Sequence, residues 1–175
     1  MKQKFLLAGM GLMITALSSN AAVMTFSTPS SAMTYSEAGM TITATSAEPV
    51  SVNGSTWALD CCDGGPETFS LATGGIFDLL SIFINHVDSS DPVVWRGYRG
   101  AAEIASTSFN SGQGSTFNFA GFAGLDRVTM SVNGNWTDPS FDNLTFQAAE
   151  VPEPASLALL GIGLAGLALR RKQRS

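Results

Sequence analysis

Apolar and polar residues alternate along short stretches in the middle of the chain. Residues 40–45 read Met-Thr-Ile-Thr-Ala-Thr, and residues 128–133 read Val-Thr-Met-Ser-Val-Asn. A period of two places the apolar side chains on one face of a strand, and no stretch of this region has the period of a helix. The pattern therefore predicts half-buried β-strands.

Turn-forming residues separate further strand candidates, for example at residues 53–54, 63–66 and 133–135. The other candidates are residues 24–27, 56–59, 68–72, 77–87, 93–98, 103–108, 115–119 and 141–147. Short strands joined by such turns favour a single all-β domain, a β-sandwich or jelly roll, over residues 23–150. Residues 77–84 are more continuously apolar, which predicts a central strand covered on both faces.

The first 22 residues have the pattern of a signal peptide. Lys2 and Lys4 precede an apolar stretch at residues 5–17, and small residues follow at 18–22. Cleavage by signal peptidase is expected here, after Ala21 in preference to Ala22 on steric grounds, so that the mature chain starts near Val23. The alternative is an uncleaved anchor helix.

The C-terminal end has three parts. Residues 151–154 read Val-Pro-Glu-Pro and are extended, because proline lacks a donor and restricts the residue before it. Residues 155–169 are apolar, glycine or serine, and residues 170–174 are mostly basic. Fifteen helical residues cover ~22 Å, less than the ~30 Å hydrocarbon core, so they predict a short transmembrane helix with its basic end in the cytoplasm.

This tail resembles the PEP-CTERM sorting signal, through residues 151–156, the Leu/Gly/Ala stretch and the basic end. The resemblance implies export across the inner membrane, transient anchoring there, and processing at Pro152, Glu153 and Pro154 by an exosortase-type transpeptidase. It also implies that the processed protein is located at the cell surface or outside the cell, in a host whose envelope carries exopolysaccharide and forms biofilm. An ordinary tail anchor that nothing cuts is the alternative.

The region between the two ends is strongly acidic. Residues 23–150 contain three arginines and thirteen aspartates or glutamates, a net charge of −10. Such a field repels phosphate backbones, so nucleic acid is excluded as a partner.

No set of residues has the pattern of a catalytic site. The single histidine, His86, has no nucleophile motif near it, and one histidine with two adjacent cysteines does not make a zinc site. Glycosidase-type carboxylate pairs can be drawn from several acidic residues, which coincidence explains in so acidic a chain. These residues are Asp60, Asp63, Glu67, Asp78 and Glu103. We therefore expect no enzyme activity.

Cys61 and Cys62 are adjacent. An exported chain meets oxidising conditions, yet neighbouring Cα atoms lie ~3.8 Å apart whereas an ordinary disulfide needs ~4.4 to 6.8 Å. A strained vicinal disulfide, two free thiols and intermolecular bridges all stay open.

The order of strands resembles that of galactose-binding-like jelly rolls, through residues 77–81, 97–100 and 141–146. The resemblance implies a Ca²⁺ ion between the N-terminal and C-terminal strands, with Glu37 at the turn before residue 40 and Asp142 on the last strand as ligands. Alternatively, Asp142 caps a turn and Glu37 is solvated.

Two functions follow. The first is a non-enzymatic cell-envelope or extracellular-matrix protein. The second is a carbohydrate-binding module that attaches to exopolysaccharide through aromatic side chains. The aromatic candidates are Trp57, Trp95, Tyr98 and Trp136. Of these, Trp57 and Trp95 are expected in the core, and Trp136 in an exposed turn.

Overall fold

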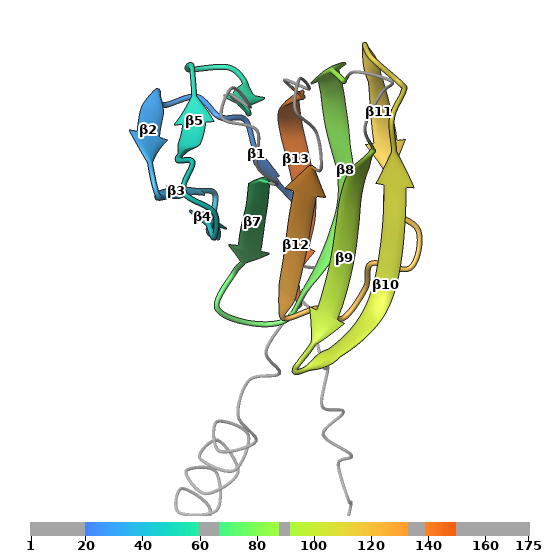
Figure 1. Cartoon of the computed structure of the whole chain (residues 1–175). Helices are drawn as coiled ribbons and strands as arrows, with labels where there is room; N and C mark the ends of the chain where they lie inside the picture. The colour runs from blue at the N-terminus through green and yellow to red at the C-terminus, as the bar shows by residue number, and fades with distance from the viewer. Residues whose placement is uncertain (1–19, 60–66, 88–91, 133–138, 150–175) are drawn as a thin grey trace, which may run out of the picture.

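The computed structural model describes residues 20–59, 67–87, 92–132 and 139–149. Within these ranges the chain forms β-strands, turns and loops, and the strands make two antiparallel sheets packed face to face (Figure 1). The predicted all-β sandwich is confirmed. The predicted signal-peptide core, membrane helix, sorting tail and both cysteines lie outside the described residues.

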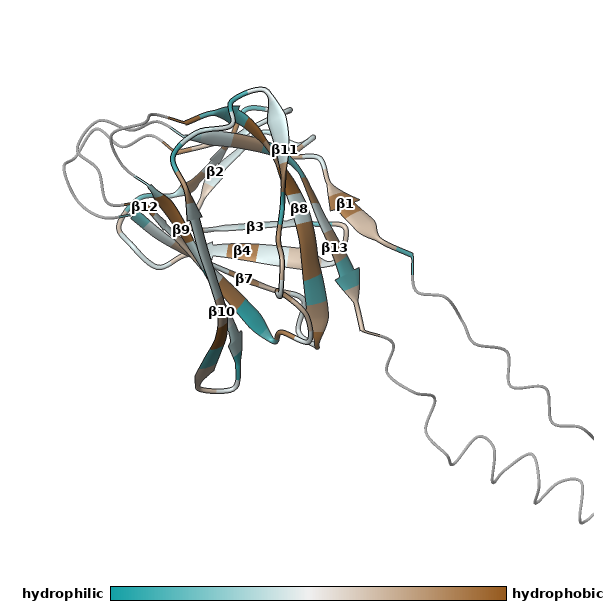
Figure 2. Ribbon diagram, turned by 90° about the vertical axis from the view of Figure 1, so that its right-hand side faces the viewer, coloured by the Kyte–Doolittle hydropathy of each residue, from teal (hydrophilic) through white to brown (hydrophobic). Residues whose placement is uncertain are grey.

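The larger sheet contains seven strands within the described ranges, in the order β11-β8-β13-β6-β5-β2, with β1 also paired to β13. They are β1 (Ala22–Met24), β2 (Ser30–Ala32), β5 (Val50–Val52), β6 (Trp57–Ala58), β8 (Phe77–His86), β11 (Ser115–Asn118) and β13 (Ser140–Ala148). Because β1 and β13 are antiparallel, with Ala22 opposite Phe146, the start of β1 and the end of β13 lie at the same end of the sandwich. Figure 2 shows the two strands side by side.

The second sheet contains six described strands in the order β10-β9-β12-β7-β4-β3. They are β3 (Thr34–Glu37), β4 (Met40–Ala44), β7 (Glu67–Ala72), β9 (Val93–Arg99), β10 (Ala102–Phe109) and β12 (Arg127–Val132). Buried and half-buried residues alternate along β4 and β7, as the period-two pattern predicts.

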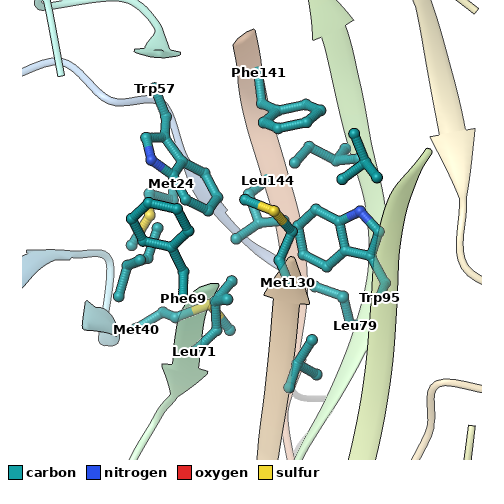
Figure 3. Close-up of a cluster of buried hydrophobic side chains, with 14 of the residues drawn as sticks. Met24, Met40, Trp57, Phe69, Leu71, Leu79, Trp95, Met130, Phe141 and Leu144 are labelled. Carbon is teal, nitrogen blue, oxygen red and sulfur yellow. The ribbon is translucent and has the colours of Figure 1, made fainter. Parts of the chain in front are cut away.

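Aromatic, aliphatic and methionine side chains fill the space between the sheets (Figure 3). The ring of Phe141 on β13 lies between two fully buried tryptophans, with its centroid 5.8 Å from that of Trp57 and 6.1 Å from that of Trp95. Trp57 also meets Phe69 edge-on at 5.2 Å. Such tilted and edge-on pairs add ~0.5–1.5 kcal/mol each beyond burial of their area. The expectation that both tryptophans belong to the core is confirmed.

The sequence pattern missed three strands and overstated the burial of another. Strands β2, β3 and β5, of three or four residues each, were not predicted. Strand β8 is central, between β11 and β13, as expected. Its outward side chains, such as Asp78 and Phe83, are only half-buried, so the prediction of cover on both faces is wrong.

In the part of the chain that the structure describes, no helix is long and apolar enough to cross a membrane.

Candidate functional site

Glu37 is the last residue of β3, and a two-residue turn connects it to β4. The turn residues, Ala38 and Gly39, have φ angles of +54° and +90°. Two positive φ angles match the twist of a tight hairpin, although alanine adopts this conformation at a cost. The hairpin fixes Glu37 opposite Met40 at the end of the second sheet.

The Glu37 carboxylate binds the segment that follows β1. The backbone N–H of Thr25 donates to Glu37 Oε1 at 3.1 Å, and the Thr25 hydroxyl donates to the same oxygen at 2.8 Å. The Ser27 hydroxyl reaches it at 3.3 Å, while the Tyr35 hydroxyl donates to Oε2 at 2.6 Å. Hydrogen bonds to a charged acceptor are stronger than neutral ones, so Glu37 joins the N-terminal segment to the second sheet.

These hydrogen bonds, together with burial, shift the pKa values of Glu37 and Tyr35. Burial alone would raise the pKa of Glu37, but the hydrogen bonds from Tyr35, Thr25 and the Phe26 backbone outweigh it and lower that pKa. Burial, followed by the bond to Glu37, raises the pKa of Tyr35 to about 12. At neutral pH the site therefore holds an ionised carboxylate and a neutral phenol.

A backbone kink at Phe26 brings the two hydroxyls to Glu37. Phe26 has a φ of +53°, a left-handed conformation that costs a non-glycine residue of order 1–3 kcal/mol. Its ring is fully buried, 5.8 Å from the ring of Tyr35. Buried Met24 and Phe26 alternate with exposed Thr25 and Ser27, so the alternation of β1 continues past its end, and both hydroxyls lie beside the carboxylate.

The structure brings the second predicted ligand, Asp142, into electrostatic range of Glu37. Asp142 Oδ1 accepts the backbone N–H of Asn143 at 2.6 Å, and Asn143 also has a left-handed φ of +47°. Burial raises the pKa of Asp142, the Asn143 bond lowers it, and the negative charge of Glu37 raises it again, so that the net pKa lies above its ordinary value. The two carboxylates therefore repel each other across β1 and β13.

The atoms around Glu37 suit a hard cation in chemistry. Thr25, Ser27 and Tyr35 bring hydroxyl oxygens to Glu37, and Asp142 lies within electrostatic range of it. Ca²⁺ prefers such oxygen ligands. Both Glu37 oxygens already accept hydrogen bonds, however, and no three His, Cys, Asp or Glu side chains gather anywhere within the described ranges. A cation here would need hydroxyl or backbone oxygens beside the two carboxylates. The Ca²⁺ site stays a prediction, and Thr25, Ser27 and Tyr35 are the residues that sequence reasoning missed.

The remaining candidates have structural contacts. Asp78 Oδ1 accepts the backbone N–H of Gly124 at 2.7 Å, and Glu103 forms an ion pair with Arg96 at 3.1 Å. Glu67 is buried, whereas His86 is exposed at the end of β8. Asp60, Asp63, Cys61, Cys62, Trp136 and the Pro152-Glu153-Pro154 motif lie outside the described residues.

Tyr98, the remaining aromatic candidate, is covered by a cation. The Arg127 guanidinium lies 4.4 Å from the centre of its ring, a cation–π contact on the outer face of the second sheet. The face of the Tyr98 ring that Arg127 covers is therefore not free for stacking on a sugar.

Hydroxyl side chains recur on that outer face in cross-strand rows. One row crosses all six strands through Thr34, Thr43, Ser70, Thr129, Arg96 and Ser106. A neighbouring row contains Thr68, Ser131, Val94 and Ser108. The hydroxyl-bearing residues of the first row are exposed or half-buried, so a polar ligand can reach them from solvent.

Comparison with known proteins identifies the C-terminal end. Residues 150–172 match the family model of the PEP-CTERM protein-sorting motif. No curated protein is detectably similar to the chain in sequence.

Two solved structures of a family 89 glycoside hydrolase from Clostridium perfringens resemble the chain at 15% and 14% identity, with TM-scores of 0.41 and 0.36. One contains 2-acetamido-1,2-dideoxynojirmycin, and the other contains the substrate GlcNAc-alpha-1,4-galactose. The similarity covers 66% and 61% of this chain but only 14% of the hydrolase chain in each case.

Proposed function

We propose that the chain is a non-enzymatic, exported protein of the cell envelope or extracellular matrix. The observation that carries this proposal is the PEP-CTERM motif at residues 150–172, which implies export, a membrane-anchored step and processing by an exosortase. After processing, the β-sandwich is the part that remains at the cell surface or outside the cell. Its role there is mechanical or adhesive.

The contacts of the described carboxylates support a non-enzymatic role. Glu37 accepts hydrogen bonds that join the N-terminal segment to the second sheet, and Asp78 accepts one from the Gly124 backbone. Asp142 accepts one from the adjacent Asn143, and Glu103 pairs with Arg96 on the neighbouring strand. A catalytic carboxyl group must instead lie within hydrogen-bond reach of a substrate, so that it can give a proton to the substrate or take one from it.

A second candidate, attachment to a polysaccharide, is favoured by the outer face of the second sheet. Its rows of hydroxyls can donate to and accept from the hydroxyls of a sugar polymer. Its ionisable groups include the Arg96–Glu103 ion pair and Arg127, so the face carries little of the acidic charge of the domain. An uncharged polysaccharide fits such a face better than an anionic one, which the net charge of −10 would repel.

The sorting function is tested by replacing Pro152, Glu153 and Pro154 with alanine. We expect the variant to stay in the inner membrane as an unprocessed precursor, while the parent protein and the control Glu48→Ala leave it. Immunoblots of membrane and released fractions measure the distribution. Normal processing and release of the triple variant would contradict the proposed sorting.

The polysaccharide candidate is tested on the released, processed protein. We expect saturable binding on an array of neutral glycans. The double variant Thr43→Val and Thr129→Val, which removes two hydroxyls of one row but keeps the branched shape, should weaken this binding. An array without saturable binding, or unchanged binding by the double variant, would reject this face as the glycan site.

A further inference from the structure

An apolar groove lies at the end of the sandwich where β1 starts and β13 ends. It encloses about 350 Å³ between the β3–β4 turn, the β7–β8 turn and the adjoining ends of β1 and β13. Ala22, Ala38, Ile76, Phe146 and Ala149 form its apolar lining. Among the described residues that line it, Asn20 and Thr73 are polar and none is charged, although the domain as a whole is strongly acidic.

The described part of the chain ends inside this groove. The backbone N–H of Ala149 donates to the carbonyl of Ile76 at 2.7 Å, which fixes the last described residue against the β7–β8 turn. The match to the sorting motif starts at the next residue, 150. The groove and the motif are therefore neighbours in space as well as in sequence.

The short length of chain between the groove and the sorting motif limits the distance between a processing enzyme and the sandwich. Pro152 is three residues after Ala149, so it lies at most ~11 Å from it, and Ala155 at most ~22 Å. A membrane-embedded enzyme that takes residues 152–154 into its active site has to approach this end of the sandwich. The short connection therefore brings the enzyme close to the end of the sandwich that holds the groove.

We propose that the groove is a docking surface for the processing enzyme and receives an uncharged, apolar side chain of its periplasmic surface. The inference rests on the proposed sorting function. The groove holds the domain in place while the adjacent peptide is cut, and so raises the effective concentration of the motif at the active site. An apolar, uncharged lining fits an apolar partner segment, because a charged one would lose its hydration there.

Gly75 allows the groove to be filled without disturbing the fold. A Cβ built at Gly75 meets no atom within 4 Å, and the backbone there does not need the left-handed conformation that Gly74 has at φ +77°. Because Gly75 lines the groove, Gly75→Trp places a bulky side chain at the groove, and Gly75→Ala is the matched control that adds only a methyl group there. Equal melting temperatures of the purified variants would show that both sandwiches are folded.

The experiment measures the rate of conversion of precursor to processed protein in pulse-labelled cells. We expect Gly75→Trp to slow conversion by about fivefold to tenfold, the effect of losing one anchoring contact at an interface, and Gly75→Ala to leave it unchanged. Unchanged conversion of a folded Gly75→Trp protein would overturn the docking proposal.

A second pair of variants separates docking from other effects. A flexible Gly/Ser linker of about ten residues between Ala149 and Glu150 adds ~17 Å of average reach and removes the forced contact. In this background, Gly75→Trp and the parent should be converted at equal rates. If Gly75→Trp slows conversion as much with the linker as without it, the groove does not act by docking next to the motif.

The triple alanine variant at residues 152–154 distinguishes failure of the two proposals. If it blocks conversion while Gly75→Trp has no effect, sorting stands and the docking proposal fails. If it is converted normally, the sorting proposal itself is wrong.

Discussion

The Tyr35 hydroxyl donates a 2.6 Å hydrogen bond to Oε2 of Glu37, two residues further along the same strand. Both side chains point to the interior side of β3, where Tyr35 is 6% exposed. The bond ties the hydroxyl of a core aromatic to a carboxylate that also binds the segment after β1. The N-terminal strand, the β3–β4 hairpin and the last strand thus share one polar cluster.

The raised pKa of Tyr35 predicts a loss of stability in alkaline solution. Its folded-state pKa of about 12 lies above the ordinary value of 10.0, so the contribution to folding is complete below pH 10 and is lost as the pH rises toward 12. Two pKa units correspond to about 3 kcal/mol. Chemical denaturation between these pH values should show this decline in the parent and a smaller one in Tyr35→Phe.

The titration can be observed directly, because the chain contains only two tyrosines. In Tyr98→Phe, tyrosinate absorbance reports Tyr35 alone. Ionisation of the folded protein at the pH of an exposed tyrosine would contradict both the burial of the Tyr35 hydroxyl and its bond to Glu37.

In acid solution, the contributions of Glu37 and Asp142 to stability should change with pH in opposite directions. The lowered pKa of Glu37 gives stability that is complete above its ordinary pKa of 4.5 and is lost as the pH falls through the folded-state value. The raised pKa of Asp142 acts in the opposite direction, since its stabilising effect is present at low pH and is lost as the pH rises through its folded value. We therefore expect Glu37→Gln to lower the melting temperature at neutral pH.

Asp142→Asn provides the contrast. It keeps an oxygen for the Asn143 N–H but removes the repulsion with Glu37, so the metal-free melting temperature at neutral pH should stay equal or rise. A fall as large as that of Glu37→Gln would refute the opposite signs of the two contributions.

Calcium should stabilise the folded chain if Glu37 and Asp142 share an ion. Binding to the folded state alone contributes about 2.7 kcal/mol at ~100-fold saturation, which raises the melting temperature by several degrees in a domain of this size. Magnesium at the same concentration is the control, because it screens charge equally but tolerates irregular coordination poorly. Asp142→Asn should lose most of the Ca²⁺-dependent shift. Equal shifts in melting temperature with the two ions would show that they act only by screening charge, and that Glu37 and Asp142 form no specific Ca²⁺ site.

The state of Cys61 and Cys62 has a simple chemical test. A vicinal disulfide in the secreted protein predicts no free thiol, a monomer on non-reducing gels and a gain of two hydrogens in mass on reduction. A dimer band that disappears with reductant would instead support bridges between chains.

The sequence pattern located the strands whose side chains alternate cleanly, and β4 and β12 have nearly the predicted bounds. It could not locate β3, because a charged Glu37 occupies an interior position that apolar patterning assigns to a hydrophobic residue. The pairing of that carboxylate with Thr25 and Ser27 depends on a left-handed Phe26, and backbone angles of this kind have no signature in residue type outside glycine and asparagine.

Glu37 and Asp142 were predicted together from family resemblance, and the structure places them in electrostatic range. Their distance along the chain is large, and the antiparallel pairing of β1 with β13 brings them together. Composition alone contains no information on such pairing. The apolar groove beside Ala149 escaped prediction for the same reason, since four segments distant in sequence form it.

The most direct test of the account is the intact mass of the protein released from its native host. Cleavage after Ala21 would leave Ala22, the first residue of β1, as the new N-terminus, with its pairing to Phe146 intact. Processing at the sorting motif predicts a mass that lacks residues 157–175 and includes any group attached to the new C-terminus. A released protein whose mass includes residues 157–175 would contradict the proposal that this chain is sorted by cleavage of its C-terminal signal.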